Sequence, residues 1–203
     1  MSGRFVSLEG GEGVGKSTQL ALLAEALRGR GRTVLTTREP GGSPGAEAIR
    51  RLLFDGDWGA RAEALLFAAA RADHVATVIR PALARGDWVL CDRFIDSSRA
   101  YQGAGLALGD GAVMALHGIG SDGLLPDRTL VLSLPLPDAS DRELARDGGV
   151  LDRFGRRGDD YHATLARFFD DLCAAEPDRV RKVDASGTPA EVTARLLAAL
   201  DGL

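Results

Sequence analysis

The chain has 203 residues, of which 45% are hydrophobic, and a formal net charge of −4. This length favours one domain with one substantial core, so we expect residues 1–203 to form a single domain. The acidic balance argues against a general nucleic-acid partner, and no apolar stretch is long enough to span a bilayer. Cys91 and Cys173 lack the paired spacing of a zinc site or a disulfide framework. These features predict a cytoplasmic protein with no membrane or nucleic-acid partner.

Short runs of β-branched and bulky apolar residues alternate with longer helical patterns along the chain. The predicted strands are Arg4–Leu8, Thr33–Thr37, Trp88–Cys91, Thr129–Leu134 and Val180–Val183. The predicted helices cover residues 16–29, 44–54, 60–84, 97–119, 158–175 and 189–200. Strands that alternate with helices indicate an α/β fold with a five-stranded, largely parallel sheet and helices on both faces. In such sheets ligands bind at the carboxyl ends of the strands.

A glycine-rich segment joins the first predicted strand to the first predicted helix. Its sequence is Gly10-Gly11-Glu12-Gly13-Val14-Gly15-Lys16-Ser17-Thr18. Glycines adopt backbone angles closed to other residues, so successive N–H groups converge on phosphate oxygens at the positive end of the helix. In this pattern Lys16 reaches the β- and γ-phosphates and Ser17 binds Mg²⁺. The segment therefore predicts a P-loop NTPase fold in which residues 10–18 bind a nucleoside triphosphate.

The second predicted strand ends in the segment Thr37-Arg38-Glu39-Pro40-Gly41-Gly42. Proline and glycine break the strand here and hold a compact loop, so one interpretation is a turn with solvated charges. We favour the other interpretation, in which Arg38 binds an anion, because an arginine at a strand end in this fold is well placed for one.

The third predicted strand is followed by Asp92-Arg93, and Ser98, Tyr101 and Gln102 come shortly after. Asp92 can hold Mg²⁺ or its waters, and Arg93 beside it can bridge phosphates. A surface salt bridge is the alternative for this pair. The polar cluster that follows favours a wall of a substrate site.

These motifs, taken in order, resemble those of bacterial thymidylate kinase, a P-loop nucleoside monophosphate kinase. The matching segments are Leu8–Gln19, Thr37–Gly42, Asp92–Gly103 and Leu151-Asp152-Arg153, and the resemblance continues to Val183-Asp184-Ala185. The resemblance implies a kinase that uses ATP and Mg²⁺ to phosphorylate dTMP to dTDP, and it implies a homodimer.

The resemblance also implies roles for individual residues. Phe67 matches the ring that stacks on thymine, and Arg71 matches the side chain that hydrogen-bonds the base. Without the resemblance, both would be interpreted as ordinary helix packing. Arg38 and Arg93 would bind the acceptor phosphate, Glu12 would face the acceptor sugar, and Tyr101 would crowd the 2′ position of that sugar. Ser98 and Gln102 would form a wall of the substrate site. The expected catalytic residues are Lys16, Arg93 and Glu12, and the expected metal residues are Ser17, Asp92 and Glu9.

The family takes a mobile arginine for the transferred phosphoryl group either from the P-loop or from a short lid. Here the P-loop has Gly13 in place of that arginine, so the resemblance implies a lid at about residues 138–158 that supplies it. We expect Arg153 to be the first choice and Arg146 the second. A solvated charged helix is the alternative interpretation of this segment.

Two other functions compete with this prediction. A kinase for another nucleoside monophosphate or nucleoside differs only in its base pocket. A GTPase-type switch is disfavoured because its guanine site resembles Asn-Lys-x-Asp, and this chain contains no asparagine. Of the three histidines we expect none to be catalytic, although His74, one turn after Arg71, is placed to support the base pocket.

Overall fold

The computed structural model describes residues 3–134 and 158–203. Its strands are β1 (Arg4–Glu9), β2 (Val34–Arg38), β3 (Trp88–Asp92), β4 (Arg128–Ser133) and β5 (Val180–Asp184). Its α-helices are α1 (Lys16–Gly29), α2 (Pro44–Asp55), α3 (Ala60–His74), α4 (Arg80–Ala84), α5 (Ile95–Ser98), α6 (Asp110–Ser121), α8 (Asp159–Ala175) and α9 (Pro189–Ala199), and its π-helices are η1 (Val75–Ile79) and η2 (Arg99–Gly105). Every predicted strand is confirmed to within one residue at each end.

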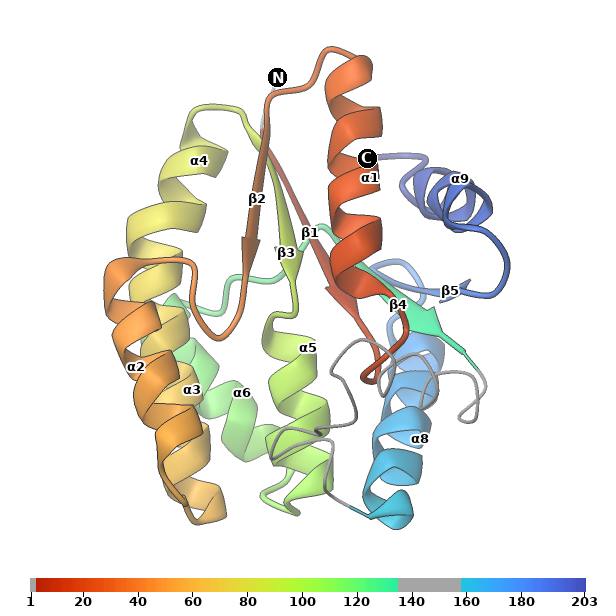
Figure 1. Cartoon of the computed structure of the whole chain (residues 1–203). Coiled ribbons are helices and arrows are strands. Elements are labelled where there is room, and N and C mark those ends of the chain that lie inside the picture. The colour runs from red at the N-terminus through yellow and green to blue at the C-terminus, as the bar shows by residue number, and fades with distance from the viewer. Residues whose placement is uncertain (1–2, 135–157) are drawn as a thin grey trace.

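The five strands form one sheet in the order β2-β3-β1-β4-β5, and every neighbouring pair is parallel, as predicted (Figure 1). The register aligns Asp92 of β3 with Leu8 of β1 on one side and with Arg38 of β2 on the other. The carboxyl ends of these three strands therefore lie at one edge of the sheet. The sequence motifs at the three strand ends are brought together there.

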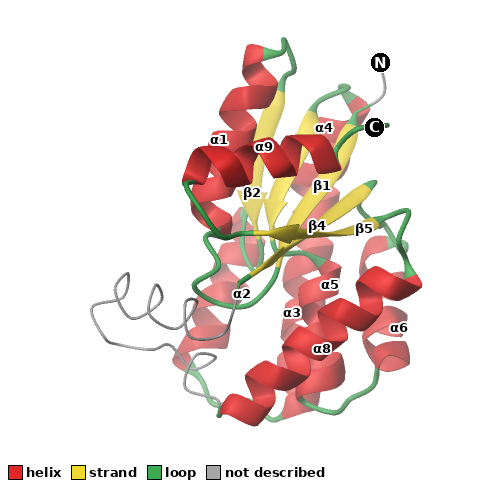
Figure 2. Cartoon of the chain, turned by 90° about the vertical axis from the view of Figure 1, so that its right-hand side faces the viewer, coloured by secondary structure: helices red, strands yellow, loops and turns green. Residues whose placement is uncertain are grey.

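Alternate residues of the strands point to opposite faces of the sheet, and each face has its own helices. Helices α1 and α9 cover one face, where Leu23, Leu27 and Leu196 pack on Val6 and Leu8 (Figure 2). The other face is covered by η1 and α4, by α5 and α6, and by α8. Its buried side chains include Phe5, Val89, Ile79, Phe94, Val131 and Phe169. The chain thus forms the doubly covered parallel sheet that its alternating pattern predicted.

The helix predicted over residues 60–84 is continuous, but it widens into the π-helix η1 between α3 and α4. The helix predicted over residues 97–119 is wrong, because η2 ends at Gly105 and α6 starts only at Asp110. Ala107 (φ 56°) and Gly109 (φ 84°) lie between them with positive φ. A right-handed helix cannot pass through residues in that conformation, so the chain turns there.

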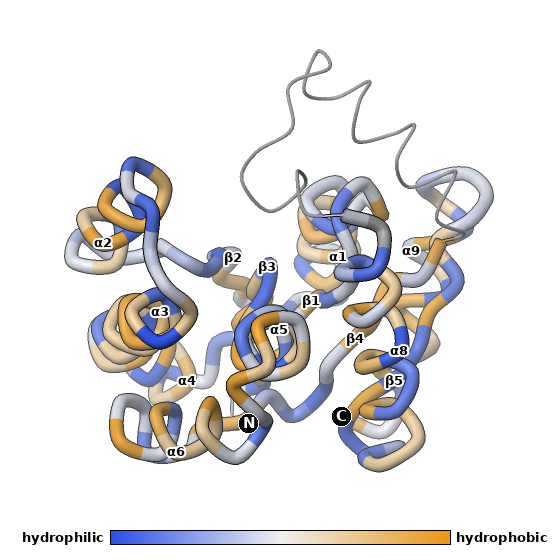
Figure 3. Tube along the Cα trace, turned by 90° about the horizontal axis from the view of Figure 1, so that it is seen from below, coloured by the Kyte–Doolittle hydropathy of each residue, from blue (hydrophilic) through white to orange (hydrophobic). Residues whose placement is uncertain are grey.

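Helices α2, α3 and α6 lie side by side along one flank of the molecule (Figure 3). Among residues 3–134 and 158–203, no helix combines the length and the hydrophobicity needed to cross a membrane. Cys91 is buried in β3 and Cys173 is partly exposed on α8, and neither forms a disulfide.

Candidate active site

The loop between β1 and α1 forms a phosphate cradle from its backbone. Gly10, Gly13 and Gly15 have φ angles of 127°, 70° and 91°, a region that costs glycine little and other residues much more. A side chain at Gly10 would also collide with the carbonyl oxygen of Leu132. Helix α1 begins directly after Gly15, and no side chain caps it, so its first N–H groups are available to an anion.

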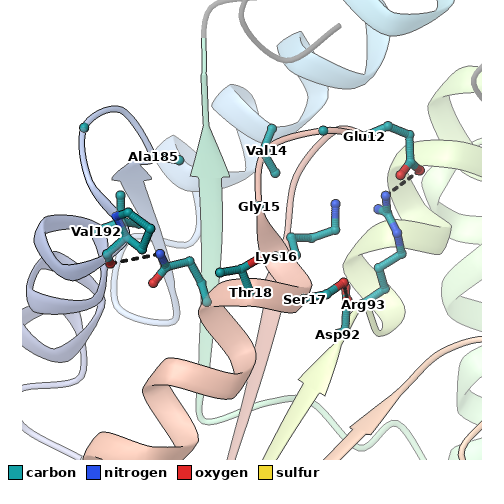
Figure 4. A pocket seen from close by; sticks show the side chains of 14 residues that line it. Glu12, Val14, Gly15, Lys16, Ser17, Thr18, Asp92, Arg93, Ala185 and Val192 are labelled. Atoms are coloured by element: carbon teal, nitrogen blue, oxygen red, sulfur yellow. Dashed lines mark hydrogen bonds and ion pairs between the residues drawn. The ribbon is translucent and has the colours of Figure 1, made fainter. Parts of the chain in front are cut away.

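Lys16 extends back under this loop, between Val14 and the Arg93–Glu12 pair (Figure 4). Its Nζ donates to the carbonyl oxygens of Gly10 (3.3 Å) and Gly11 (2.5 Å). Burial, followed by the positive charge of Arg93, lowers the pKa of Lys16 to about 8. The nearby carboxylates Glu12, Asp92 and Glu9 offset this only in part, and phosphate oxygens would stabilise the ammonium group further.

Ser17 and Asp92 meet at the adjoining ends of α1 and β3. The Ser17 hydroxyl donates to Oδ2 of Asp92 at 2.9 Å. The described residues contain no group of three or more His, Cys, Asp or Glu side chains that could hold a metal ion. A hydroxyl and a single carboxylate fit Mg²⁺, which keeps several waters and takes the rest of its oxygens from substrate phosphates.

Glu9, the third predicted metal residue, is held by protein groups. It is fully buried, and its two oxygens accept hydrogen bonds from the backbone N–H of Phe94 (2.8 Å) and from the Ser97 hydroxyl. Burial and the nearby charge of Asp96 raise the pKa of Glu9 to about 7. Glu9 lines neither of the cavities described below, so the structure does not bring it to Ser17 and Asp92. Its contacts hold the start of α5 against the end of β1.

Arg93 lies directly after Asp92 and holds two other predicted site residues. Its Nη2 donates to Oε1 of Glu12 at 2.6 Å, and its Nη1 donates to the carbonyl oxygen of Gly10 at 3.0 Å. The guanidinium lies 4.9 Å from the centre of the Tyr101 ring, and the Tyr101 hydroxyl donates to the same Glu12 oxygen. Burial alone would lower the pKa of Arg93, but Glu12 and the other acidic groups nearby together outweigh it and raise that pKa above its ordinary value. Arg93 is therefore a permanent cation.

Two cavities meet at this cluster. The first, of about 390 Å³, is lined by the cradle residues 12–19 and continues to Ala185, Gly187, Pro189 and Val192 around the start of α9. The second, of about 300 Å³, is lined by residues of the β2–α2 loop, α3, α5 and η2. Both volumes fall within, or close to, the usual range of small-molecule sites. The residues that line both cavities are Glu12, Ser17, Asp92 and Arg93.

Arg71 provides the most constrained polar group of the second cavity. It is buried, and its Nε donates to Oε2 of Glu39 at 2.8 Å. Its Nη2 donates to the Ser98 hydroxyl at 2.7 Å and to the Phe94 carbonyl oxygen at 3.4 Å. Phe67, one turn earlier on α3, lines the same cavity. The predicted pair of a ring and a guanidinium is thus brought together with Ser98.

Gln102 and Arg38 complete the predicted side chains of the second cavity. Gln102 donates Nε2 to Glu63 at 2.9 Å, and its buried Oε1 accepts nothing from the part of the chain that the structure describes. A buried acceptor without a partner on a cavity wall is available to a ligand donor. Arg38 is half exposed and pairs with Glu47 at 3.0 Å. Its charge faces solvent and the cavity mouth.

The sequence analysis did not predict several residues of the site. Glu39 lies in a recognised motif but was given no role, and nothing in the sequence pointed to Glu63. Arg50, which donates to the Pro40 carbonyl oxygen at 2.8 Å, also lines the second cavity. At the far end of the first cavity, Ala185 lies in a segment that the resemblance covers, but neither it nor Val192 was predicted to line a site. The predicted lid at about 138–158, with Arg146 and Arg153, lies outside the described residues apart from residue 158.

A glycine cradle with its own lysine, a hydroxyl–carboxylate pair for a metal and a second cavity that shares a charged wall define a P-loop phosphotransferase. The sequence model of the thymidylate kinase family matches residues 8–196. The chain belongs to the thymidylate kinase family, and its reaction is the phosphorylation of dTMP to dTDP.

Similar proteins span the whole chain. It is 59% identical to a thymidylate kinase of Rhizorhabdus wittichii over 100% of this chain and 99% of the relative. It is 51% identical to a thymidylate kinase of Gluconobacter oxydans over 98% and 94% of the two chains. The crystal structure of thymidylate kinase from Ehrlichia chaffeensis superposes with a TM-score of 0.78 at 29% identity, covering 98% of this chain and 99% of that one. The fold, the family and the reaction predicted from the sequence are confirmed.

Proposed function

We propose that ATP binds in the first cavity and dTMP in the second, and that the phosphoryl group is transferred across the wall they share. The observation that carries this assignment is that wall: Glu12, Ser17, Asp92 and Arg93 line both cavities. In-line transfer requires donor and acceptor phosphates to meet at one point, with positive charge and a metal site beside them. Arg93 supplies the charge, and the Ser17–Asp92 pair supplies the metal ligands.

In the donor cavity the cradle N–H groups and Lys16 hold the phosphates. The adenosine end then lies toward Ala185 and Val192, the far end of the same cavity (Figure 4). Mg²⁺, when bound through Ser17 and Asp92, neutralises charge on the phosphates and orients them. Lys16 adds a fixed positive charge at the donor phosphates, and its burial makes that charge more effective than it would be in water.

In the acceptor cavity we assign the phosphate of dTMP to Arg93 and Arg38. The thymine ring stacks on Phe67, with Nη1 of Arg71 directed to its edge, since Nε and Nη2 are already used by protein partners. Ser98 and Gln102 form the polar wall. The Tyr101 ring crowds the sugar, held there by its hydroxyl on Glu12, and would reject a 2′-hydroxyl sterically.

The transferred phosphoryl group needs a further cation. In the part of the first cavity that the structure describes, the lining cations are Lys16 and Arg93, and Gly13 contributes none. We propose that the lid at about residues 138–158 supplies it, from Arg153 or else Arg146. The family is cytosolic, and we propose that compartment for this chain.

We further propose a homodimer formed through the flank of α3 and α6. These neighbouring helices carry two large apolar side chains that are strongly exposed, Leu65 (56%) and Ile119 (85%). Exposed apolar side chains gathered on one flank mark an interaction surface. Sedimentation of Ile119→Asp, with Leu125→Asp as the control outside these helices, tests this: the first should be monomeric and the second should not.

Equilibrium binding to two variants tests the assignment of the cavities. Phe67→Ala should weaken dTMP binding and leave the binding of a non-hydrolysable ATP analogue unchanged, because Phe67 lines only the second cavity. Lys16→Met should show the opposite pattern. If both variants weaken the same nucleotide, the two cavities are not separate donor and acceptor sites.

A further inference from the structure

His74 is a fully buried histidine at the last residue of α3. Its Nδ1 lies 3.0 Å from Oε1 of Glu39, and its Nε2 lies 2.7 Å from the Thr37 hydroxyl. Both ring nitrogens are therefore engaged, each by a residue from the carboxyl end of β2 or from the loop that follows it.

Glu39 divides its carboxylate between two residues of α3. Oε1 faces His74, and Oε2 accepts from Nε of Arg71 at 2.8 Å. All three side chains are at least 90% buried, so a Glu39 carboxylate without its His74 contact has no solvent to replace it. The orientation of the Arg71 guanidinium therefore depends on a carboxylate that His74 holds in place.

The contact with Glu39 determines which nitrogen of the His74 imidazole carries a proton. A carboxylate can only accept, so Nδ1 of His74 carries a proton and donates to Glu39. In the neutral ring Nε2 then accepts from the Thr37 hydroxyl. A side chain at Gly42, whose φ is 85°, would collide with both His74 and Thr37. The loop that begins beside Arg38 is thus packed directly onto the imidazole.

We propose that His74 is a positioning residue for base selection, acting through Glu39 to set the direction in which Arg71 donates. This inference rests on the proposed role of Arg71 in reading the base. A second buried histidine provides a contrast. His117 bonds the Leu124 carbonyl oxygen through Nε2 at 2.7 Å, while its Nδ1 has no partner among the described residues. His117 contacts no carboxylate in that part of the chain, whereas His74 contacts the one that holds Arg71.

Selection between dTMP and dCMP measures this role. An arginine donor pairs with the O4 carbonyl of thymine but not with the amino group that replaces it in cytosine. A guanidinium that is correctly directed therefore raises the ratio of kcat/KM for dTMP to kcat/KM for dCMP. A purely structural defect lowers stability and both activities but leaves that ratio unchanged.

Three variants separate the two contacts of His74. In H74N the amide nitrogen lies near the position of Nδ1 and can still donate to Glu39, whereas in H74Q the amide lies near Nε2 and reaches Thr37 instead. H74F keeps the volume and removes both contacts. We expect H74N to keep the selectivity of the unchanged enzyme, and H74Q and H74F to lower it about tenfold, mainly through a higher KM for dTMP.

Two controls make the outcomes decisive. H117N alters an equally buried histidine and should leave the ratio unchanged. R71K tests the proposed base site itself: if it leaves the ratio unchanged, that site assignment fails. If R71K lowers the ratio but H74Q does not, or if H74N loses as much selectivity as H74Q, the inference about His74 is overturned. Should H74F not fold, the pair of amide variants decides the question, since both can hydrogen-bond within the site.

Discussion

The two halves of the active site are built in different ways. The cradle is one continuous stretch, residues 10–17, and in the proposed assignment its backbone does most of the phosphate binding. The second cavity, where we propose that the base binds, takes side chains from the β2–α2 loop, α2, α3, α5 and η2. Phosphate is bound in the same way in many enzymes, so a local backbone device suffices. A base is recognised by the direction of single hydrogen bonds, which only side chains fixed from several elements can provide.

The two halves also differ in the groups that hold their polar and charged side chains. Three long polar side chains of the second cavity are held by carboxylates: Arg71 by Glu39, Gln102 by Glu63, Arg93 by Glu12. Among the described residues, the hydrogen-bond partners of Lys16 are two carbonyl oxygens. If the proposed assignment holds, the acceptor half is ordered before substrate arrives, whereas the charge of Lys16 is left for the phosphates to satisfy.

Replacing Lys16 is the strongest test of the cradle. Lys16→Met should lower turnover by roughly 10²–10³, as expected when one preorganised charge beside a developing negative charge is lost, while the fold is kept. Steady-state kinetics and a thermal melt measure the two effects. Lys182→Met is the matched control, because Lys182 is about half exposed and pairs with Asp170 on the surface. Near-normal turnover in a folded Lys16→Met enzyme would contradict the assignment.

The next test asks whether phosphoryl transfer needs an arginine from the lid in addition to the cations of the cradle. Arg153→Ala, or failing that Arg146→Ala, should slow the chemical step by roughly 10²-fold and change dTMP affinity little, because the contact is made mainly in the transition state. Single-turnover transfer with ATP already bound, paired with equilibrium dTMP binding, separates the effects. Arg167→Ala on α8 serves as the control. Unchanged transfer in both lid variants would leave Arg93 or Arg38 as the cation.

Variants of Tyr101 test whether the acceptor half excludes a ribose sugar by its shape. Tyr101→Ala should raise the relative kcat/KM for the ribose form of the substrate about tenfold, because space opens beside the sugar. Tyr101→Phe keeps the ring and loses the hydroxyl with its bond to Glu12, so its selectivity should change much less. The comparison uses thymidine and ribothymidine monophosphates, which share a base. Equal discrimination in all three enzymes would show that the ring does not contact the sugar.

The smallest predicted effect is a pH dependence of kcat/KM for ATP, which arises in the cradle and not in the acceptor half. Because the pKa of Lys16 is lowered to about 8, the free enzyme loses this cation as pH rises through that value. The kcat/KM for ATP, which reports free-enzyme ionisations, should fall to about half its plateau near pH 8 and continue to fall above it. Lys16→Arg should remove this inflection, since guanidinium stays protonated. An inflection unchanged in that variant would have another source.

The sequence predicted the cradle because its residues are contiguous and its glycines have one local explanation. It predicted the strand ends because short apolar runs stop at charged residues. The break at Ala107 was missed, since alanine carries no sign of positive φ. The pairs Arg71–Glu39 and Gln102–Glu63 were missed for a different reason. Their members are 32 and 39 residues apart and meet only after α3 has packed against the sheet and η2, so no local pattern records them.

Lys16 and Lys182 are the only side-chain amines of this chain. One is buried in the cradle with a pKa of about 8, and the other lies on the surface in an ion pair. Amines attack electrophiles as the free base, so a lysine of lowered pKa is activated at mildly alkaline pH. A small acylating reagent should therefore modify two lysines in the free protein, besides any free α-amine, and ATP should protect only one of the two lysines. Because lysine is scarce, the mass of the acylated protein reports the fraction of molecules in which ATP occupies the cradle, without an added label.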